Sequence, residues 1–168
     1  MTDLKRHIVE VPDFPRPGVL FRDITPLLRA HFAATLAAFE ALFSAEEWRA
    51  TDALAGIESR GFILAAGLAA HLNKGFIAIR KGGKLPPPVE AVDYRLEYGS
   101  AVLELQRGSG RILLIDDVVA TGGTMAAAAR LARAAGFHVG GFATLVDLHL
   151  GGAFQWEGMP LRSVLSYD

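Results

Sequence analysis

Four apolar residues, two adjacent acids and a short loop of small and hydroxyl residues fill positions 112–124, which read ILLIDDVVATGGT. The alanine-rich stretch from Met125 to Ala135 follows and has a helical pattern. The order is that of a buried strand, an acidic strand end, a phosphate-sized loop and a helix. Loop amides and a helix N-terminus form an anion site. Two carboxylates beside it suit ribose hydroxyls or a metal ion, so the run favours a sugar phosphate with a second charged group, bound with magnesium.

Short apolar runs alternate with helical patterns along most of the chain. The runs that predict strands are 53–57, 76–79, 111–115, 139–146 and 161–165. The patterns that predict helices are 31–43, 62–72 and 124–135. Continuous apolar strands that alternate with helices indicate a parallel sheet covered on both faces. The predicted fold class is therefore α/β, a Rossmann-like central parallel sheet with helices on both faces.

Three unusual segments follow predicted strands, at residues 58–61, 81–98 and 116–124. Ligands on parallel sheets bind at the carboxyl ends of the strands, so these segments are expected to meet at one edge. The chain is predicted to be a single domain over residues 1–168. Its first 30 residues or so lack a core of their own and are expected to fold over that edge as a hood.

A long excursion interrupts the alternation at about residues 81–105. Its first part, residues 81–93, contains two lysines, a Gly-Gly pair and three consecutive prolines. Long loops in compact domains are usually functional or disordered, so we expect a flexible functional loop. Tyr94 to Tyr98 and Ala101 to Leu105 alternate as strands, which predicts a β-hairpin turning at Gly99-Ser100.

Composition narrows the function classes. The chain has 168 residues, of which 51% are hydrophobic and 21% charged, and this fits one globular domain. A formal net charge of −1 gives no global basic field for nucleic acid or an anionic membrane. The absence of cysteine excludes disulfides, thiol nucleophiles and thiolate metal sites. Residues 1–7 have no apolar stretch behind their charges, and the apolar run at 61–70 is too short to span a bilayer. The expectation is a cytoplasmic protein without nucleic-acid or membrane partners.

Four stretches, in order along nearly the whole chain, match the motifs of one family. Residues 12–26 resemble the opening segment of adenine phosphoribosyltransferases, and residues 56–62 resemble their pyrophosphate loop. Residues 80–86, followed by 94–99, resemble their flexible catalytic loop. Residues 112–124 resemble the motif for phosphoribosyl pyrophosphate (PRPP) of all type I phosphoribosyltransferases. The first and third matches narrow the resemblance to adenine.

The resemblance implies that PRPP and adenine react to give AMP and pyrophosphate. Departure of pyrophosphate gives the ribosyl C1 oxocarbenium character, as in glycoside chemistry. Mg²⁺ is the implied cofactor, held mainly by substrate and water, with no direct protein ligand assigned. PRPP and adenine are the implied small-molecule partners, and the family suggests a homodimer.

The resemblance places the substrate's sugar phosphate on the PRPP motif. The implied ligands of the 5′-phosphate are Ala120, Thr121, Gly122, Gly123 and Thr124. A plain helix N-cap provided by Thr121 is the structural alternative. Asp116 and Asp117 are implied to bind the ribose hydroxyls, and the alternative is that they only cap a solvated loop.

Pyrophosphate recognition is implied for the second and third stretches. Ser59 and Arg60 would contact it, Arg60 as a multi-donor cation that is also counted among the catalytic residues. Lys81 and Lys84 would approach it when the loop closes. The structural alternatives are a surface arginine at a strand end and solvated loop lysines.

Glu97 is the implied proton carrier for the purine ring, and Tyr98 beside it would help close the site. Their alternative role is that of alternating hairpin residues. For adenine, Leu20, Phe21 and Arg22 are the candidates, with backbone groups around Leu20 reading the exocyclic amine. Phe21 could pack against the purine ring, but a core position is the favoured role for this residue.

Arg22 has an alternative role as a structural clamp. It would then pair with Asp23 or Glu97 instead of the base. The segment from Asp147 to Trp156 matches the family only loosely and is not expected to touch the phosphate motif. Two further functions remain open on the sequence. One is a phosphoribosyltransferase for another purine base, and the other is a PRPP-sensing regulator without turnover.

Overall fold

The computed structural model describes residues 3–96 and 99–167. Its helices are η1 (Leu4–His7), α1 (Thr25–Glu40), α2 (Ala45–Arg49), α3 (Arg60–His71) and α4 (Gly123–Ala134). Its strands are β1 (Val9–Val11), β2 (Phe21–Asp23), β3 (Ala53–Ile57), β4 (Gly75–Lys81), β5 (Val89–Leu96), β6 (Gly99–Gln106), β7 (Arg111–Val119), β8 (His138–Asp147), β9 (Gln155–Trp156) and β10 (Met159–Ser166). None of these helices is long and apolar enough to cross a membrane.

A central sheet orders its strands β5-β6-β4-β3-β7-β8-β10-β9. The inner strands from β4 to β10 run parallel, whereas β6, β5 and β9 are antiparallel additions at the edges. Strand β3 lies between β4 and β7, and all of its residues are buried. That double coverage explains why its sequence is continuously apolar, and it confirms the predicted parallel sheet.

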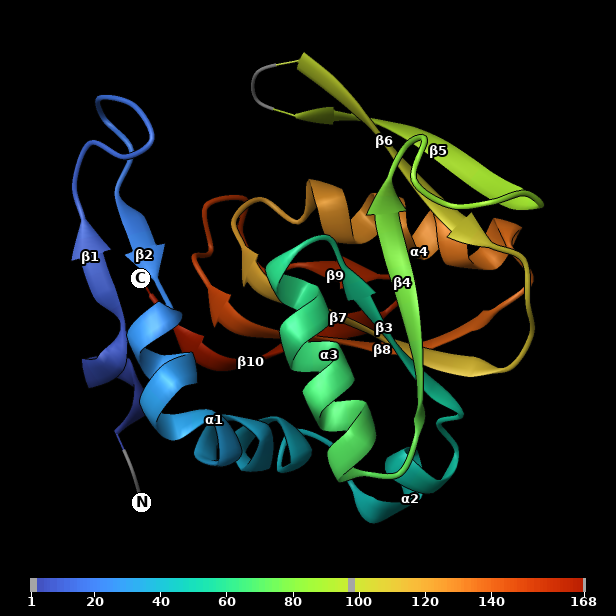
Figure 1. The fold of residues 1–168 in the computed structure, drawn as a ribbon, viewed down its shortest axis with the longest axis horizontal. Coiled ribbons are helices and arrows are strands. Elements are labelled where there is room, and N and C mark those ends of the chain that lie inside the picture. Colours follow the sequence, from blue (N-terminus) through green and yellow to red (C-terminus); the bar gives the residue numbers. More distant parts are fainter. Residues whose placement is uncertain (1–2, 97–98, 168) are drawn as a thin grey trace.

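Helices cover both faces of the sheet (Figure 1). One hydrophobic core joins α4 to the sheet and to the β5-β6 hairpin. The other joins the sheet to η1, α1, α2 and α3. The predicted α/β class with helices on two faces is therefore confirmed.

The N-terminal strands stand apart from the main sheet. β1 and β2 form their own antiparallel pair, and in Figure 1 this pair lies beside α1, close to the C-terminus of the chain. Each strand has only three residues, and most of the side chains are exposed or half-buried. A ribbon with so little buried surface depends on the elements it packs against.

Several boundaries differ from the predictions. α1 was predicted at 31–43 but runs from Thr25 to Glu40. It begins early because Thr25-Pro26 suits a helix start. The predicted end was too late because the apolar spacing continues past the helix to Phe43. Strand β5 begins at Val89, and β6 begins at Gly99, which pairs with Leu96. Gly99 is therefore a strand residue, and the prediction of a turn at Gly99-Ser100 is wrong.

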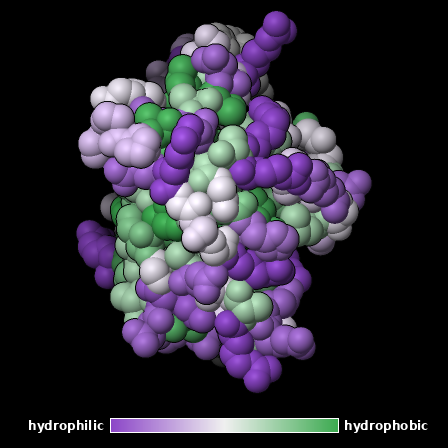
Figure 2. Space-filling view, turned by 90° about the vertical axis from the view of Figure 1, so that its right-hand side faces the viewer, coloured by the Kyte–Doolittle hydropathy of each residue, from purple (hydrophilic) through white to green (hydrophobic). Residues whose placement is uncertain are grey.

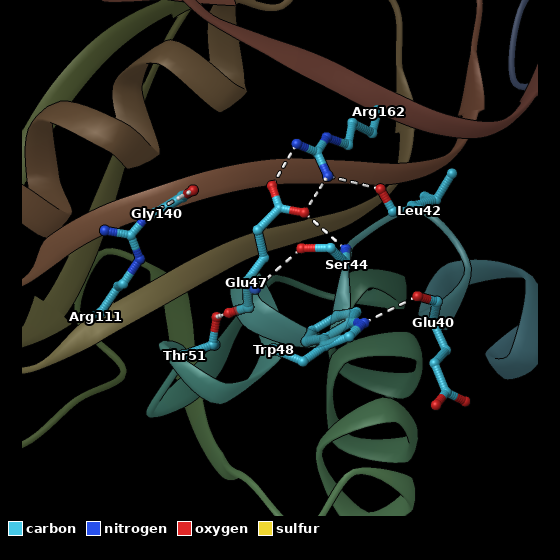
Figure 3. A network of polar contacts seen from close by, with 9 residues as sticks. All are labelled: Glu40, Leu42, Ser44, Glu47, Trp48, Thr51, Arg111, Gly140 and Arg162. Carbon is cyan, nitrogen blue, oxygen red and sulfur yellow. Dashed lines mark hydrogen bonds and ion pairs between the residues drawn. The ribbon is translucent and has the colours of Figure 1, made fainter.

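A polar network fixes α2 against β10 (Figure 3). Ser44 and Glu47 form a capping box at the start of α2. The guanidinium of Arg162 donates to Glu47 at 2.5 and 3.0 Å and to the Leu42 carbonyl at 2.7 Å. The hydrogen bonds from Arg162 and from the Ser44 amide lower the pKa of Glu47 to about 2. The network joins the start of α2 to β10, and none of its residues belongs to the carboxyl ends of β3 and β7.

Candidate active site

The loop between β7 and α4 is built to leave amides free. Gly122 is the N-cap of α4 and has a φ of 84°, in the left-handed region that favours glycine. No side chain caps this helix, so Thr121 is not its N-cap and that alternative is wrong. The first amides of α4 consequently have no intrahelical acceptor and are available to an anion.

The two acids of the PRPP motif lie within β7 and not after it. β7 pairs with β8 as far as Val119, so Asp116 and Asp117 belong to the strand and are 8% and 7% exposed. The alternative that they cap a solvated loop is therefore wrong. Burial, and next the adjacent charge of Asp117, raise the pKa of Asp116 well above its ordinary value.

Arg60 reaches this acidic pair from the first turn of α3. Its Nη2 lies 2.7 Å from Asp117 Oδ2, which makes an ion pair but accepts no well-directed hydrogen bond. The close approach depends on Gly61, because a Cβ there would lie 3.0 Å from both Asp116 Oδ1 and the Ile115 carbonyl oxygen. Arg60 is thus half-buried and paired, and does not point freely from the surface.

The segment before Arg60 binds the loop that carries the two lysines. Glu58, joined to Ser59 by a cis peptide bond, forms an ion pair with Lys84 and accepts from the Lys81 amide at 2.9 Å. The hydrogen bond from Lys84, followed by that from Lys81, lowers the pKa of Glu58 to about 2. The structure therefore brings Ser59, Lys81 and Lys84 to one place, with the Lys84 ammonium on a carboxylate.

A second carboxylate, that of Glu104, accepts hydrogen bonds from the backbone of the same loop. Glu104 on β6 is 5% exposed and accepts hydrogen bonds from the amides of Gly83, Lys84 and Leu85 at 2.9, 2.5 and 2.5 Å. The hydrogen bond from Gly83 is the main cause that lowers the pKa of Glu104. Sequence reasoning missed this residue, because in sequence it is only one position of an alternating strand.

A cavity of about 910 Å³ lies between the N-terminal segment and the α4 loop. Among the predicted residues, it is lined by Leu20, Arg22, Asp116, Ala120, Thr121, Gly122, Gly123 and Thr124. Sequence reasoning missed several of its other lining residues, namely Arg16, Arg95, Leu148, Leu150 and Tyr167. Asp117 and Arg60 do not line the cavity themselves, but Asp117 follows the lining residue Asp116 and pairs with Arg60. The predicted meeting of the three strand-end segments at one edge is therefore found.

The hood residues differ from the expectations in their contacts. Phe21 is half-buried outside both cores, with its ring 5.1 Å from that of Phe14 and 5.1 Å from Arg60 Cζ, so the core alternative for Phe21 is wrong. Arg22 pairs with Glu10 at 3.5 Å. The alternative role of Arg22 as a clamp named Asp23 or Glu97 as its partner; Glu10 takes the place of Asp23, and Glu97 lies outside the described residues.

The partner exchange at Arg22 has a local cause. Asp23 Oδ1 instead accepts a hydrogen bond from the Thr25 amide at 2.9 Å. The carboxylate of Asp23 is therefore engaged at the start of α1 and does not pair with Arg22. Arg22 lies opposite Glu10 in the β1-β2 pair, where the two side chains share one face. Leu20 is 44% exposed and faces the cavity.

The segment after β8 packs directly on the phosphate motif. The amides of Leu148 and Leu150 donate to the carbonyls of Val119 and Ala120 at 2.9 and 3.1 Å. The prediction that residues 147–156 do not touch this motif is therefore wrong. The reason is that β8 runs parallel to β7 and both strands end at the same edge. Glu97 and Tyr98 lie outside the described residues.

A phosphoribosyltransferase is defined by these features together: a parallel sheet, a central strand that carries two buried acids near its carboxyl end, a loop with free amides, the helix after it and a guanidinium beside the acids. The family model for the phosphoribosyl transferase domain matches residues 28–155. Within this class, the chain is 50% identical to an adenine phosphoribosyltransferase of Hydrogenovibrio crunogenus over 98% of this chain and 96% of that one. A second such enzyme, from Bdellovibrio bacteriovorus, is 47% identical over 98% and 99% of the two chains. The chain belongs to the adenine phosphoribosyltransferases of the type I family.

Solved structures agree with this assignment. Adenine phosphoribosyltransferase from Rhodothermus marinus superposes with a TM-score of 0.86 at 42% identity, covering 98% of this chain and 96% of that one. The Saccharomyces cerevisiae enzyme superposes with a TM-score of 0.88 at 32% identity, covering 97% of both chains. That structure contains D-2,5-dideoxy-2,5-imino-altritol 1,6-bisphosphate and adenine.

Proposed function

We propose that this protein transfers the 5-phosphoribosyl group from PRPP to adenine, giving AMP and pyrophosphate in purine salvage. The observation that carries the proposal is the junction of Arg60 and Asp117, 2.7 Å apart, beside the free amides of the α4 loop. A guanidinium and a helix N-terminus, separated by two carboxylates, match a substrate with phosphate at one end and pyrophosphate at the other.

Each part of PRPP has a partner in this arrangement. The amides and hydroxyls of residues 120–124 hold the 5′-phosphate, and Asp116 and Asp117 accept hydrogen bonds from the ribose hydroxyls. Ser59, Arg60, Lys81 and Lys84 bind pyrophosphate as it departs, and the three cations among them offset its negative charge. Lys84 then exchanges the Glu58 carboxylate for a phosphate oxygen.

We assign recognition of adenine, and proton transfer to or from it, to the N-terminal hood and the loop at 81–105. Residues 1–30 contribute Leu20 and Arg22 to the cavity lining, with Phe21 between them in sequence, and backbone groups near Leu20 distinguish an amine from an oxo group on the purine. The loop and hairpin at 81–105 carry Glu97 as the proton carrier and Tyr98 as a closing residue. These segments and the sheet form one catalytic domain over residues 1–168.

Mg²⁺ fits the donor set of this site. Asp117 Oδ2 is a buried carboxylate oxygen that accepts no well-directed hydrogen bond, and hard oxygen donors are what Mg²⁺ prefers. The described residues contain no group of three His, Asp or Glu side chains that could hold a metal. Substrate and water are therefore proposed as the main ligands. When bound, Mg²⁺ supplies positive charge to the pyrophosphate leaving group.

A homodimer is the proposed assembly. Ile63 on α3 and Phe76 on β4 are 47% and 42% exposed, and the Phe76 ring packs edge-on against Phe62. Figure 2 shows one side of the molecule as a mosaic of hydrophilic side chains and small hydrophobic areas. The proposed location is the cytoplasm, and the cysteine-free sequence fits such a reducing compartment.

One experiment tests the function. The protein is incubated with Mg²⁺ and PRPP, and adenine, hypoxanthine, guanine and xanthine are offered separately while nucleotide and pyrophosphate are quantified. AMP from adenine alone is the expected result. Turnover of another base would contradict the roles of Leu20 and Arg22, and binding of PRPP without any product would favour the regulatory alternative.

A further inference from the structure

Tyr167, next to the last residue of the chain, is held at the edge of the cavity. Its amide donates to the Asp147 carbonyl at 2.9 Å, which continues the pairing of β10 with β8 by one residue. Its ring lines the cavity together with Leu20 and Arg22. In Figure 1 the C-terminus accordingly lies beside β2. The sheet therefore delivers an aromatic ring to the base of the hood.

Two cations from different parts of the N-terminal segment contact this ring. Arg22 Cζ lies 4.0 Å from the ring centroid and Lys5 Nζ lies 4.1 Å from it. Lys5 also donates to the Ser166 carbonyl at 3.1 Å. η1, β2 and β10 thus meet at one side chain, although they come from opposite ends of the chain.

The position of Arg22 depends on few other contacts. Its ion pair with Glu10 is long, at 3.5 Å, and Glu10 is exposed. Its Nε is buried and has no hydrogen-bond partner among residues 3–96 and 99–167. The β1-β2 ribbon has little core of its own, so a contact with the rigid sheet is what can fix its place. The Tyr167 ring is the contact of that kind made by Arg22.

We propose that Tyr167 is a positioning residue for base recognition: its ring holds Arg22, and with it the Leu20 segment, at the cavity wall. This inference rests on the proposed adenine transfer. Among the described residues, no hydrogen bond or ring contact joins Tyr167 to the α4 loop or to the Arg60–Asp117 pair, so we expect PRPP binding to depend little on Tyr167. Loss of the ring therefore affects the base and spares the sugar phosphate.

The test separates the two substrates. Tyr167→Met keeps an apolar side chain of similar length without an aromatic face, and Tyr167→Phe keeps the face without the hydroxyl. For Tyr167→Met we expect the KM for adenine to rise about tenfold, the order of one desolvated cation–π contact, with the KM for PRPP within about twofold. Tyr167→Phe is expected to recover most of the affinity for adenine.

A matched control removes another arginine–aromatic contact, one that lies outside the cavity. Arg133 Cζ lies 4.4 Å from the Trp156 ring on β9, outside the cavity lining. Trp156→Met is expected to lower the melting temperature without a selective change in the KM for adenine. If Tyr167→Met does not fold, Tyr167→Leu takes its place.

Two results would overturn the proposal. One is an unchanged KM for adenine in the Met or Leu variant, and the other is an equal rise of both KM values that Trp156→Met reproduces. AMP formation by the parent protein is measured first. A parent without AMP formation rejects the proposed function, whereas an active parent with unselective variants rejects only the role of Tyr167.

Discussion

Arg60 Nη2 and Asp117 Oδ2 lie 2.7 Å apart, and this pair joins the turn after β3 to the end of β7. The two segments are 57 positions apart in sequence, and β3 and β7 are neighbours in the sheet. The guanidinium compensates one of two adjacent buried carboxylates. The candidate pyrophosphate and ribose sites are therefore joined into one unit by this ion pair.

Asp117→Asn tests this unit. The substitution removes the charge facing Arg60 and one ribose acceptor while it keeps the side-chain shape. We expect kcat/KM to fall by about 100-fold or more, the cost of losing a charged group that acts on the reacting sugar, with the fold intact. Initial rates and thermal melting measure both effects.

The control for this variant is Glu157→Gln. Glu157 also forms an ion pair with an arginine, Arg133, but at an exposed position away from the cavity. Its loss is expected to leave kcat/KM within about twofold, as for most surface pairs. An Asp117→Asn variant with the activity of the parent protein would remove Asp117 from the site.

Glu104→Gln tests the buried support of the lysine loop. One neutral carbonyl replaces a carboxylate that receives three successive amides, so we expect the free energy of unfolding to fall. The loop should also open more often, which raises the KM for PRPP. Limited trypsin digestion at Lys81 and Lys84 measures the opening directly.

Glu90→Gln is the matched change on the neighbouring strand, since Glu90 on β5 pairs with exposed Arg107. It is expected to leave the trypsin pattern and the KM for PRPP near those of the parent protein. Equal digestion rates for Glu104→Gln and the parent would show that the amide contacts do not hold the loop.

The inner strands of the sheet could be predicted from the sequence, because a strand buried on both faces has a continuous run of apolar residues. β3 was predicted at its observed bounds, 53–57, for that reason. β1 and β2 were missed because three residues are too few to show a period. β7 was predicted too short, since its acids read as an exposed end although β8 pairs beyond them.

In the candidate site too, residues that are contiguous in sequence could be predicted, whereas residues brought together by the fold could not. The phosphate loop is contiguous in sequence, so residues 120–124 were identified together. Glu104 and Tyr167 were not, because their contacts depend on how distant segments meet. Glu104 is buried only because residues 83–85 fold back over β6, and Tyr167 lies at the hood only because β10 ends beside β2.

Glu97→Ala tests the proton carrier that the sequence predicts. Loss of a positioned general acid or base typically costs between about 100-fold and 10,000-fold, so kcat should fall by at least about 100-fold. The KM for PRPP should change little. Steady-state rates over a range of pH are the measurement. Asp93→Asn, an exposed carboxylate on the same hairpin, serves as control. Full activity of Glu97→Ala would remove Glu97 from the mechanism.

Glu47→Gln tests the network that fixes α2 to β10. The hydrogen bonds from Arg162 and Ser44 lower the pKa of Glu47 from 4.5 to about 2. A lowered carboxyl pKa stabilises the fold fully above pH 4.5, and this stabilisation is lost as the pH falls toward 2. At pH 7 the variant should be less stable by about 1 kcal/mol, a value discounted because the Glu47 side chain is about one-third exposed.

Urea unfolding at several pH values between neutrality and about pH 3 measures this difference. The gap between the parent protein and Glu47→Gln should narrow as the pH falls below 4.5, because the Glu47 carboxyl of the unfolded parent then binds a proton that must be released on folding. Glu46→Gln changes an exposed carboxylate of the same helix and should show a small gap at every pH. A gap for Glu47→Gln that stays constant down to pH 3 would mean that packing, and not the ion pair with Arg162, holds α2 in place.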